Sequence, residues 1–296
     1  MNAAWRHNVI TKFLNFLLAP GLFQSPQVAH ALILGSVVAI TSAIVGVFAV
    51  IRGQAFAGHA LADFGATGAS GAFLLGINTL WGFIGMGLLG GLGMDMLGRT
   101  PRERDVTTGI TLSFMLGLGS LFLYYVTTKT TATGAPMTIF FGSIFLVNPS
   151  IVSIVIILEL VTLLLLVILY RPLLLSSINP DLAYTRGVPL RTVSLLFMSA
   201  LVLTVEQSAL VTGALLSTVL LIGPAAIAIR LTKRLGTTLL LSVFVGLVTM
   251  WLSIVLAYDS AQLPPVGRGW PVSFFVVSII LLFYSVIYSF TTKGSK

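Results

Sequence analysis

The sequence contains no cysteine and very little charge. Without cysteine, disulfide bonds and thiolate metal ligands are excluded, so any metal ion must be held by nitrogen or oxygen atoms. Only 8% of the 296 residues are charged, whereas 57% are hydrophobic and the mean hydropathy is +1.06. This composition predicts an all-α integral membrane protein, because a helix satisfies its own backbone hydrogen bonds in lipid.

The chain also lacks long polar segments and the phosphate-binding string GxxxxGK[ST]. No stretch between the apolar runs could build a separate core, so we expect one transmembrane domain, residues 30–296, after an N-terminal interfacial segment, residues 1–29. Residues 8–24 are short and interrupted by Pro20, which suits an amphipathic helix at the interface. If they cross the membrane, one span is added. A signal peptide is a poor fit, because Asn15 and Pro20 interrupt the apolar core.

Apolar runs of about 20 residues predict nine spans. They fall at 30–51, 54–77, 79–98, 106–127, 151–171, 191–207, 209–230, 236–258 and 271–291.

Basic residues set the orientation, because cytoplasmic loops carry the excess of lysine and arginine. With the C-terminus in the cytoplasm, twelve of the sixteen basic residues are cytoplasmic: Arg52, Arg99, Arg102, Arg104, Arg171, Arg186, Arg191, Arg230, Lys233, Arg234, Lys293 and Lys296. Arg6, Lys12, Lys129 and Arg268 lie outside. The net charge of +8 is therefore explained by basic residues at the ends of membrane spans. Because these residues do not cluster with aromatic residues, no nucleic-acid partner is expected.

Two segments between the predicted spans are expected to form short helices. PMTIFFGSIFLV, residues 136–147, is about half the length of a span and predicts a re-entrant half-helix on the outer side. On the inner side, DLAYTRG predicts a short helix, with Asp181 near its amino end and Gly187 ending it. An ordinary solvated loop is the alternative reading of this second segment.

The most polar stretch inside a predicted span is GHALADFGATGASG, residues 58–71. His59 and Asp63 are one helical turn apart, about 6 Å along the axis, so they present a nitrogen and a carboxylate on one face. Counted from Arg52 at the inner surface, they lie about 10 to 17 Å into the membrane, where transporters bind their cargo. The alternative is a structural pair that fixes helix packing. Gly65, Gly68 and Gly71 are expected to serve close helix packing.

Two further acids, Glu159 and Glu206, lie in or beside the membrane and are additional candidates for an ion path. Glu159 could instead pair with a neighbouring helix, and Glu206, at a predicted span end, could be solvated.

Other chemistries fit the sequence less well. His59 and Asp63 spell HxxxD, but the acyltransferases that use this spacing are large and soluble. GASG, residues 68–71, resembles the GxSG of intramembrane serine proteases, but no histidine follows His59 to serve as a base. A proton-coupled secondary carrier predicts internal repeats with matching broken helices, and none is evident.

Several blocks together resemble the permease subunits of the ATP-binding-cassette (ABC) importers for manganese, zinc and iron. They are GVFAVIRGQAFAGHALAD (46–63), RERDVTTGITLSFMLGLGSLF (102–122), FFGSIFLVNPS (140–150), DLAYTRGVPLR (181–191), VTGALLSTVLLIGPAAIAIRL (211–231) and YDSAQLPPVGRGWPV (258–272). In the family, the first block has aspartate before histidine. Here the order is exchanged, which keeps the ligand types and alters their geometry. Pro224, in the fifth block, is expected to be a packing residue.

The resemblance implies a permease in the bacterial cytoplasmic membrane that moves a divalent metal ion and binds no cofactor tightly. It also implies a homodimer, a cytoplasmic ABC ATPase that binds ATP, and an extracytoplasmic metal-binding protein. DLAYTRG would then be the coupling helix that meets the ATPase, with Asp181, Ala183 and Gly187 at the matching positions.

Overall fold

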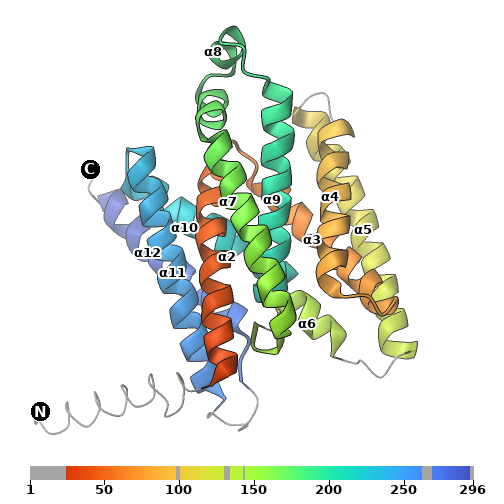
Figure 1. Ribbon diagram of the computed structural model, residues 1–296. Helices are drawn as coiled ribbons and strands as arrows, with labels where there is room; N and C mark the ends of the chain where they lie inside the picture. The colour runs from red at the N-terminus through yellow and green to blue at the C-terminus, as the bar shows by residue number, and fades with distance from the viewer. Residues whose placement is uncertain (1–24, 98–100, 130–133, 143, 262–268, 294–296) are drawn as a thin grey trace, which may run out of the picture.

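The chain folds into a bundle of α-helices (Figure 1). In this computed structural model the described residues are 25–97, 101–129, 134–142, 144–261 and 269–293, and they contain no strand. Seven helices are long and apolar enough, over their described residues, to cross a membrane. They are α2 (Pro26–Ile51), α5 (Pro101–Lys129), α7 (Pro149–Ile178), α9 (Leu190–Thr212), α10 (Ala214–Leu231), α11 (Leu235–Ser260) and α12 (Val272–Lys293). The all-helical fold is confirmed, whereas the expected segment 8–24 lies outside the described residues.

Two further helices, α3 (Ala55–Leu74) and α4 (Thr79–Leu97), are not among those seven. Helix α3 is rich in small and polar residues, and it packs most closely against α4 and α5. A Cβ atom on Gly68 of α3 would overlap the Gly82 carbonyl oxygen of α4, so the two backbones touch at these glycines. This close approach buries α3 within the bundle.

Two span boundaries differ from the sequence prediction. Helix α9 runs through Ser208 to Thr212, and the break before α10 comes at Gly213, whose φ of +85° favours glycine. Helix α7 continues past residue 171 to Ile178 with Pro172 inside it. A proline removes one backbone donor without always ending a helix, so α7 continues beyond the predicted boundary.

The half-length segment 136–147 contains two short helical pieces, α6 (Ala135–Phe141) and the 3₁₀ turn η2 (Ile144–Leu146). Gly142, with φ of +74°, ends α6. Figure 1 places α6 at the end of the bundle opposite α8 (Pro180–Thr185). Helix α8 is the short helix that the sequence predicted in DLAYTRG.

Helix starts follow local sequence signals. Proline occupies the first turn of α2, α6, α7 and α8, where its missing N–H costs no hydrogen bond. Asn148 and Asn179 cap α7 and α8 by accepting hydrogen bonds from Ser150 N (3.1 Å) and Leu182 N (3.0 Å). The prolines and caps fix where α8 leaves the bundle.

A tight backbone crossing joins Gly142 and Gly213. A Cβ on Gly142 would lie 2.5 Å from the Gly213 nitrogen, and one on Gly213 would overlap the Phe140 carbonyl oxygen. We expect Gly213→Ala to lower the free energy of unfolding by about 1–3 kcal/mol, because the methyl group must displace backbone. Thermal unfolding of the purified protein in detergent measures it. Gly134→Ala is the matched control, since its φ is −84° and nothing lies within 4 Å of the added atom. Equal stability of the two variants would contradict the packing at this crossing.

Candidate functional site

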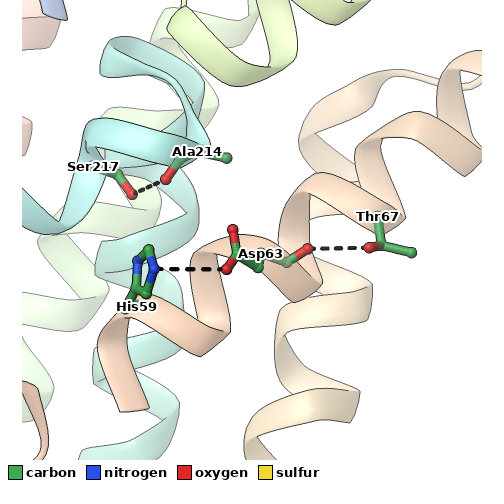
Figure 2. A network of polar contacts seen from close by, with 5 residues as sticks. All are labelled: His59, Asp63, Thr67, Ala214 and Ser217. Atoms are coloured by element: carbon green, nitrogen blue, oxygen red, sulfur yellow. Dashed lines mark hydrogen bonds and ion pairs between the residues drawn. The ribbon is translucent and has the colours of Figure 1, made fainter. Parts of the chain in front are cut away.

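The candidate site begins with His59 and Asp63 on α3 (Figure 2). Nε2 of His59 lies 3.9 Å from Oδ2 of Asp63, as expected for residues one turn apart. The two side chains differ in exposure, 45% for His59 and 6% for Asp63. The imidazole therefore lies at the open side of α3, and the carboxylate points into the bundle.

Thr67, one turn beyond Asp63, fixes the position of α3. Its Oγ1 lies 3.1 Å from the Asp63 carbonyl oxygen and 2.8 Å from the Met115 carbonyl oxygen of α5. On another side α3 packs against α10, where Ser217 donates a hydrogen bond to the Ala214 carbonyl (3.1 Å; Figure 2). Neighbours on two sides thus hold the helix that carries His59 and Asp63.

Glu206 of α9 lies next to this pair and is fully buried. Its carboxyl group rests against Gly65 of α3 and Gly87 of α4, and a Cβ atom on either glycine would overlap it. Among the described residues neither carboxyl oxygen has a hydrogen-bond partner, and Asp63 is close enough to interact with the group electrostatically. The structure therefore brings Glu206 to the level of Asp63, at the junction of three helices.

Glu159 lies elsewhere. It is fully buried on α7, which packs mainly against α2 and α9, and its carboxyl faces Thr41 of α2. Neither of its oxygens meets the geometric requirements of a hydrogen bond. His59, Asp63 and Glu206 thus lie together around α3. Glu159 lies apart from them, where α7 packs against α2 and α9.

Thr41 of α2 and Thr204 of α9 are both fully buried. The ring of Phe48 on α2 contacts the ring of Phe197 on α9, with centroids 6.5 Å apart. Thr41 and Thr204 lie seven residues from Phe48 and Phe197, on the same helix faces. Glu159 therefore faces a buried threonine of α2 and lies apart from the His59–Asp63 pair.

The described residues contain no group of three or more histidine, aspartate and glutamate side chains that could hold a metal ion. His59 and Asp63 supply one nitrogen and one carboxylate, which is fewer than a structural zinc site needs. Such a pair suits an ion that binds and leaves again.

The expected coupling residues lie at one end of the molecule, where α8 projects between α7 and α9 (Figure 1). Asp181 is exposed in the first turn, Ala183 is fully buried, and Gly187 has φ of +74° just after the helix. Leu182 and Tyr184 expose 42% and 75% of their surface. The segment thus offers an exposed face on a backbone fixed at both ends.

The expected packing residues are all in close contacts. Gly65 meets Glu206, Gly68 meets the backbone of Gly82, and a Cβ on Gly71 would lie 3.2 Å from the ring of Phe122. Pro224 is buried inside α10, where its ring lies 3.7 Å from the Cβ position of Gly246 on α11.

Two contributors were not singled out in the sequence. Gly87 makes room for Glu206, and Thr67 links α3 to α5. The glycine-rich string GMGLLGGLG of α4 signalled close packing, but no spacing rule pairs Gly87 with an acid more than a hundred residues away.

The sequence matches the ABC 3 transport family over residues 24–289. It is 30% identical to the manganese import system permease protein ScaB of Streptococcus parasanguinis over 252 residues, 85% of this chain and 87% of that protein. It is 27% identical to the manganese transport system membrane protein MntC of Listeria innocua, over 82% of this chain and 85% of that protein.

The fold is also similar to that of solved structures, two of which follow. One is PsaBC from Streptococcus pneumoniae in complex with Fab, with TM-score 0.74, 27% identity, and coverage of 93% of this chain and 95% of that chain. The other is an inward-facing putative metal-chelate type ABC transporter, with TM-score 0.66 and 17% identity over 91% of this chain and 87% of that chain. At 17% identity, the second likeness concerns the fold alone.

Adding one methyl group at Gly87 tests the position of the Glu206 carboxyl group. We expect Gly87→Ala to lower the free energy of unfolding by about 1–3 kcal/mol, because the new Cβ displaces a buried carboxyl group. Gly85→Ala, on the same helix with nothing within 4 Å of the added atom, is the control. Thermal unfolding in detergent compares them. A Gly87→Ala protein as stable as Gly85→Ala would argue against this placement of Glu206.

Proposed function

The chain belongs to the ABC 3 transport family, and from this membership we propose that it carries Mn²⁺ or a similar divalent metal ion past His59 and Asp63. It is the permease subunit of a metal importer of the ABC type. Manganese is the first candidate because the ScaB and MntC relatives are named for its transport. Zinc and iron accept the same nitrogen and oxygen ligands and are the other candidates.

The observation that carries the proposal is the His59–Asp63 pair on a buried helix of the bundle. An imidazole nitrogen and a carboxylate oxygen are suitable ligands for a divalent transition-metal ion. Counted from Ala55 at the inner end of α3, they lie about 6 and 12 Å up the helix. Two protein ligands hold the ion weakly, so it can be released to the other side.

Glu206 supplies the second negative charge of this path. Asp63 and Glu206, when ionised, together balance the two charges of a divalent ion, and His59 adds a neutral ligand. A buried carboxyl group without a hydrogen-bond partner is costly in an apolar bundle, and a passing cation offsets that cost. Glu159, which faces α2 from α7, lies outside the path.

A second copy of the chain would complete the path. The His59 side chain is 45% exposed although it lies partway up a buried helix, so a single copy would leave the imidazole open on one side. A homodimer with the path between the two copies covers it and adds a second set of ligands.

The partners follow from the two ends of the molecule. An ABC ATPase, which binds the ATP, would dock in the cytoplasm on the exposed face of α8, with Asp181, Ala183 and Gly187 shaping that contact. An extracytoplasmic metal-binding protein would deliver the ion at the opposite end. No tightly bound cofactor and no nucleic acid are required.

The membrane topology completes the proposal. Helices α3 and α4 contain 20 and 19 residues, about 30 Å at 1.5 Å per residue, which is enough to cross. With the seven other candidate spans they give nine spans, a cytoplasmic C-terminus and an interfacial segment at residues 1–29, in the bacterial cytoplasmic membrane. The segment formed by α6 and η2 enters from the outer side without crossing.

Removing either ligand tests the path. In liposomes containing the permease, its ATPase and its binding protein, we expect His59→Ala and Asp63→Ala to reduce ATP-dependent Mn²⁺ uptake at least about tenfold, since each removes one of two protein ligands. Ser70→Ala is the control, because within the described part of the chain its hydroxyl bonds only to the Ala66 carbonyl of its own helix. Normal uptake by both assembled variants would overturn the site. Uptake by the isolated chain, driven by a proton gradient, would instead favour a secondary carrier.

The two buried acids can be compared directly. Glu206→Gln keeps the shape of the side chain and removes its charge, so we expect uptake to fall at least about fivefold while the complex still assembles. Glu159→Gln should transport like the unaltered protein. Uptake in the same liposomes decides between them, and the reverse pattern would move the path from α3 to α7.

A further inference from the structure

The corner between α2 and α3 is rigid. Helix α2 ends at Ile51, only three residues separate it from α3, and Gly53 has φ of +66°. Gln54 N donates to the Ala49 carbonyl (2.8 Å) and Gly53 N donates to the Val50 carbonyl (3.1 Å), which is the hydrogen-bond pattern of a glycine-ended helix. A displacement of Arg52, within this corner, therefore also displaces the start of α3.

The side chain of Arg52 leaves this corner and reaches α7. Nη1 lies 3.2 Å from the Ser176 hydroxyl and 3.3 Å from the Ser177 hydroxyl. Both hydroxyls donate to the Leu173 carbonyl, so their lone pairs are available to accept from the guanidinium. This contact holds the last turn of α7 against the end of α2.

Arg52 also contacts α9. Its guanidinium carbon lies 5.3 Å from the centre of the Phe197 ring, in reach of a cation–π interaction. Among the described residues the only ion pair is His59–Asp63, so Arg52 has no carboxylate within 4 Å there. Two hydroxyls and one ring, on two helices, are the partners of this half-buried cation.

These two helices are the ones that flank α8. Ser177 lies three residues before Pro180, the first residue of α8, and Phe197 lies in the second turn of α9, the helix that follows it. In the other direction along the chain, Arg52 precedes His59 by seven residues. One side chain thus connects both flanks of α8 to the helix that carries His59 and Asp63.

We propose that Arg52 is a positioning residue that transmits movement of α8 and its flanking helices to α3, so that the ion path opens and closes with the ATPase cycle. The inference rests on the proposed function, in which α8 meets the ATPase and α3 carries the path. The planar guanidinium bonds two hydroxyls while stacking on a ring, whereas a lysine ammonium acts as a point charge and does not hold the same geometry.

The test separates transmission from folding. Ser176→Ala/Ser177→Ala removes the acceptors and leaves Arg52 in place, and Arg52→Lys keeps the positive charge that orients the chain. In liposomes with ATPase and binding protein, both variants should assemble and hydrolyse ATP, while Mn²⁺ uptake per ATP hydrolysed falls at least about fivefold. A purely structural contact would lower the amount of complex and leave that ratio unchanged.

Two substitutions serve as matched controls for this experiment. Ser199→Ala removes a hydroxyl of α9 whose one hydrogen bond to the described residues is to the Leu195 carbonyl of its own helix. Arg171→Lys alters an exposed basic residue of α7. Both should keep the uptake ratio of the unaltered protein. If the unaltered complex shows no ATP-dependent uptake, the proposed function fails. If the unaltered complex transports Mn²⁺, and the Ser176/Ser177 and Arg52 variants keep its ratio of uptake to ATP hydrolysed, only the transmission proposal fails.

A second experiment measures the movement of α3 itself. The chain has no cysteine, so Ala55→Cys, at the start of α3, introduces one labelling site. A spin label there should change its mobility on ATP binding in the otherwise unaltered complex. With Ser176→Ala/Ser177→Ala added, that change should disappear while the ATPase still binds ATP. An unchanged ATP response would overturn the proposal.

Discussion

The cost of burying carboxyl groups among apolar helices is the constraint on which the rest of the structure depends. Asp63 points into the bundle, and Glu206 is fully buried with both carboxyl oxygens unpartnered. Such groups persist where a ligand or a proton offsets the loss of water. A divalent cation moving past His59 is the proposed source of that compensation, so the cost of burying these carboxylates favours entry of the ion.

Glycine makes this arrangement sterically possible. Gly65 and Gly87 leave room for the carboxyl of Glu206, and Gly68 and Gly82 bring α3 and α4 into backbone contact. Helix α3 is consequently held by α4, α5, α9 and α10, although it is less apolar than the seven candidate spans. The polar composition that suits an ion path is compatible with the membrane because neighbouring helices, rather than lipid, surround it.

Helix α9 connects the candidate site to the end of the molecule that carries α8. It begins just after α8, contacts Arg52 through Phe197, and carries Glu206 to the level of Asp63. Arg52 adds a second connection through the last turn of α7. The exchanged order of histidine and aspartate suits this geometry, since it puts the imidazole at the exposed position and the carboxylate beside Glu206. Two adjacent contacts thus join the proposed ATPase surface to the proposed ion path.

The sequence by itself determined the solvent, the helical class, the short helix α8 and the pairing of His59 with Asp63, because composition and i, i+4 spacing are local properties. It misplaced the break at Gly213 and the end of α7, since only the folded backbone shows which glycine takes a positive φ and which proline is accommodated within a helix. The tertiary structure alone decided that Glu206 lies by Asp63 while Glu159 faces Thr41, and that Arg52 reaches Ser176. Such contacts depend on how helices rotate and slide against one another, and side-chain packing across the bundle sets that register.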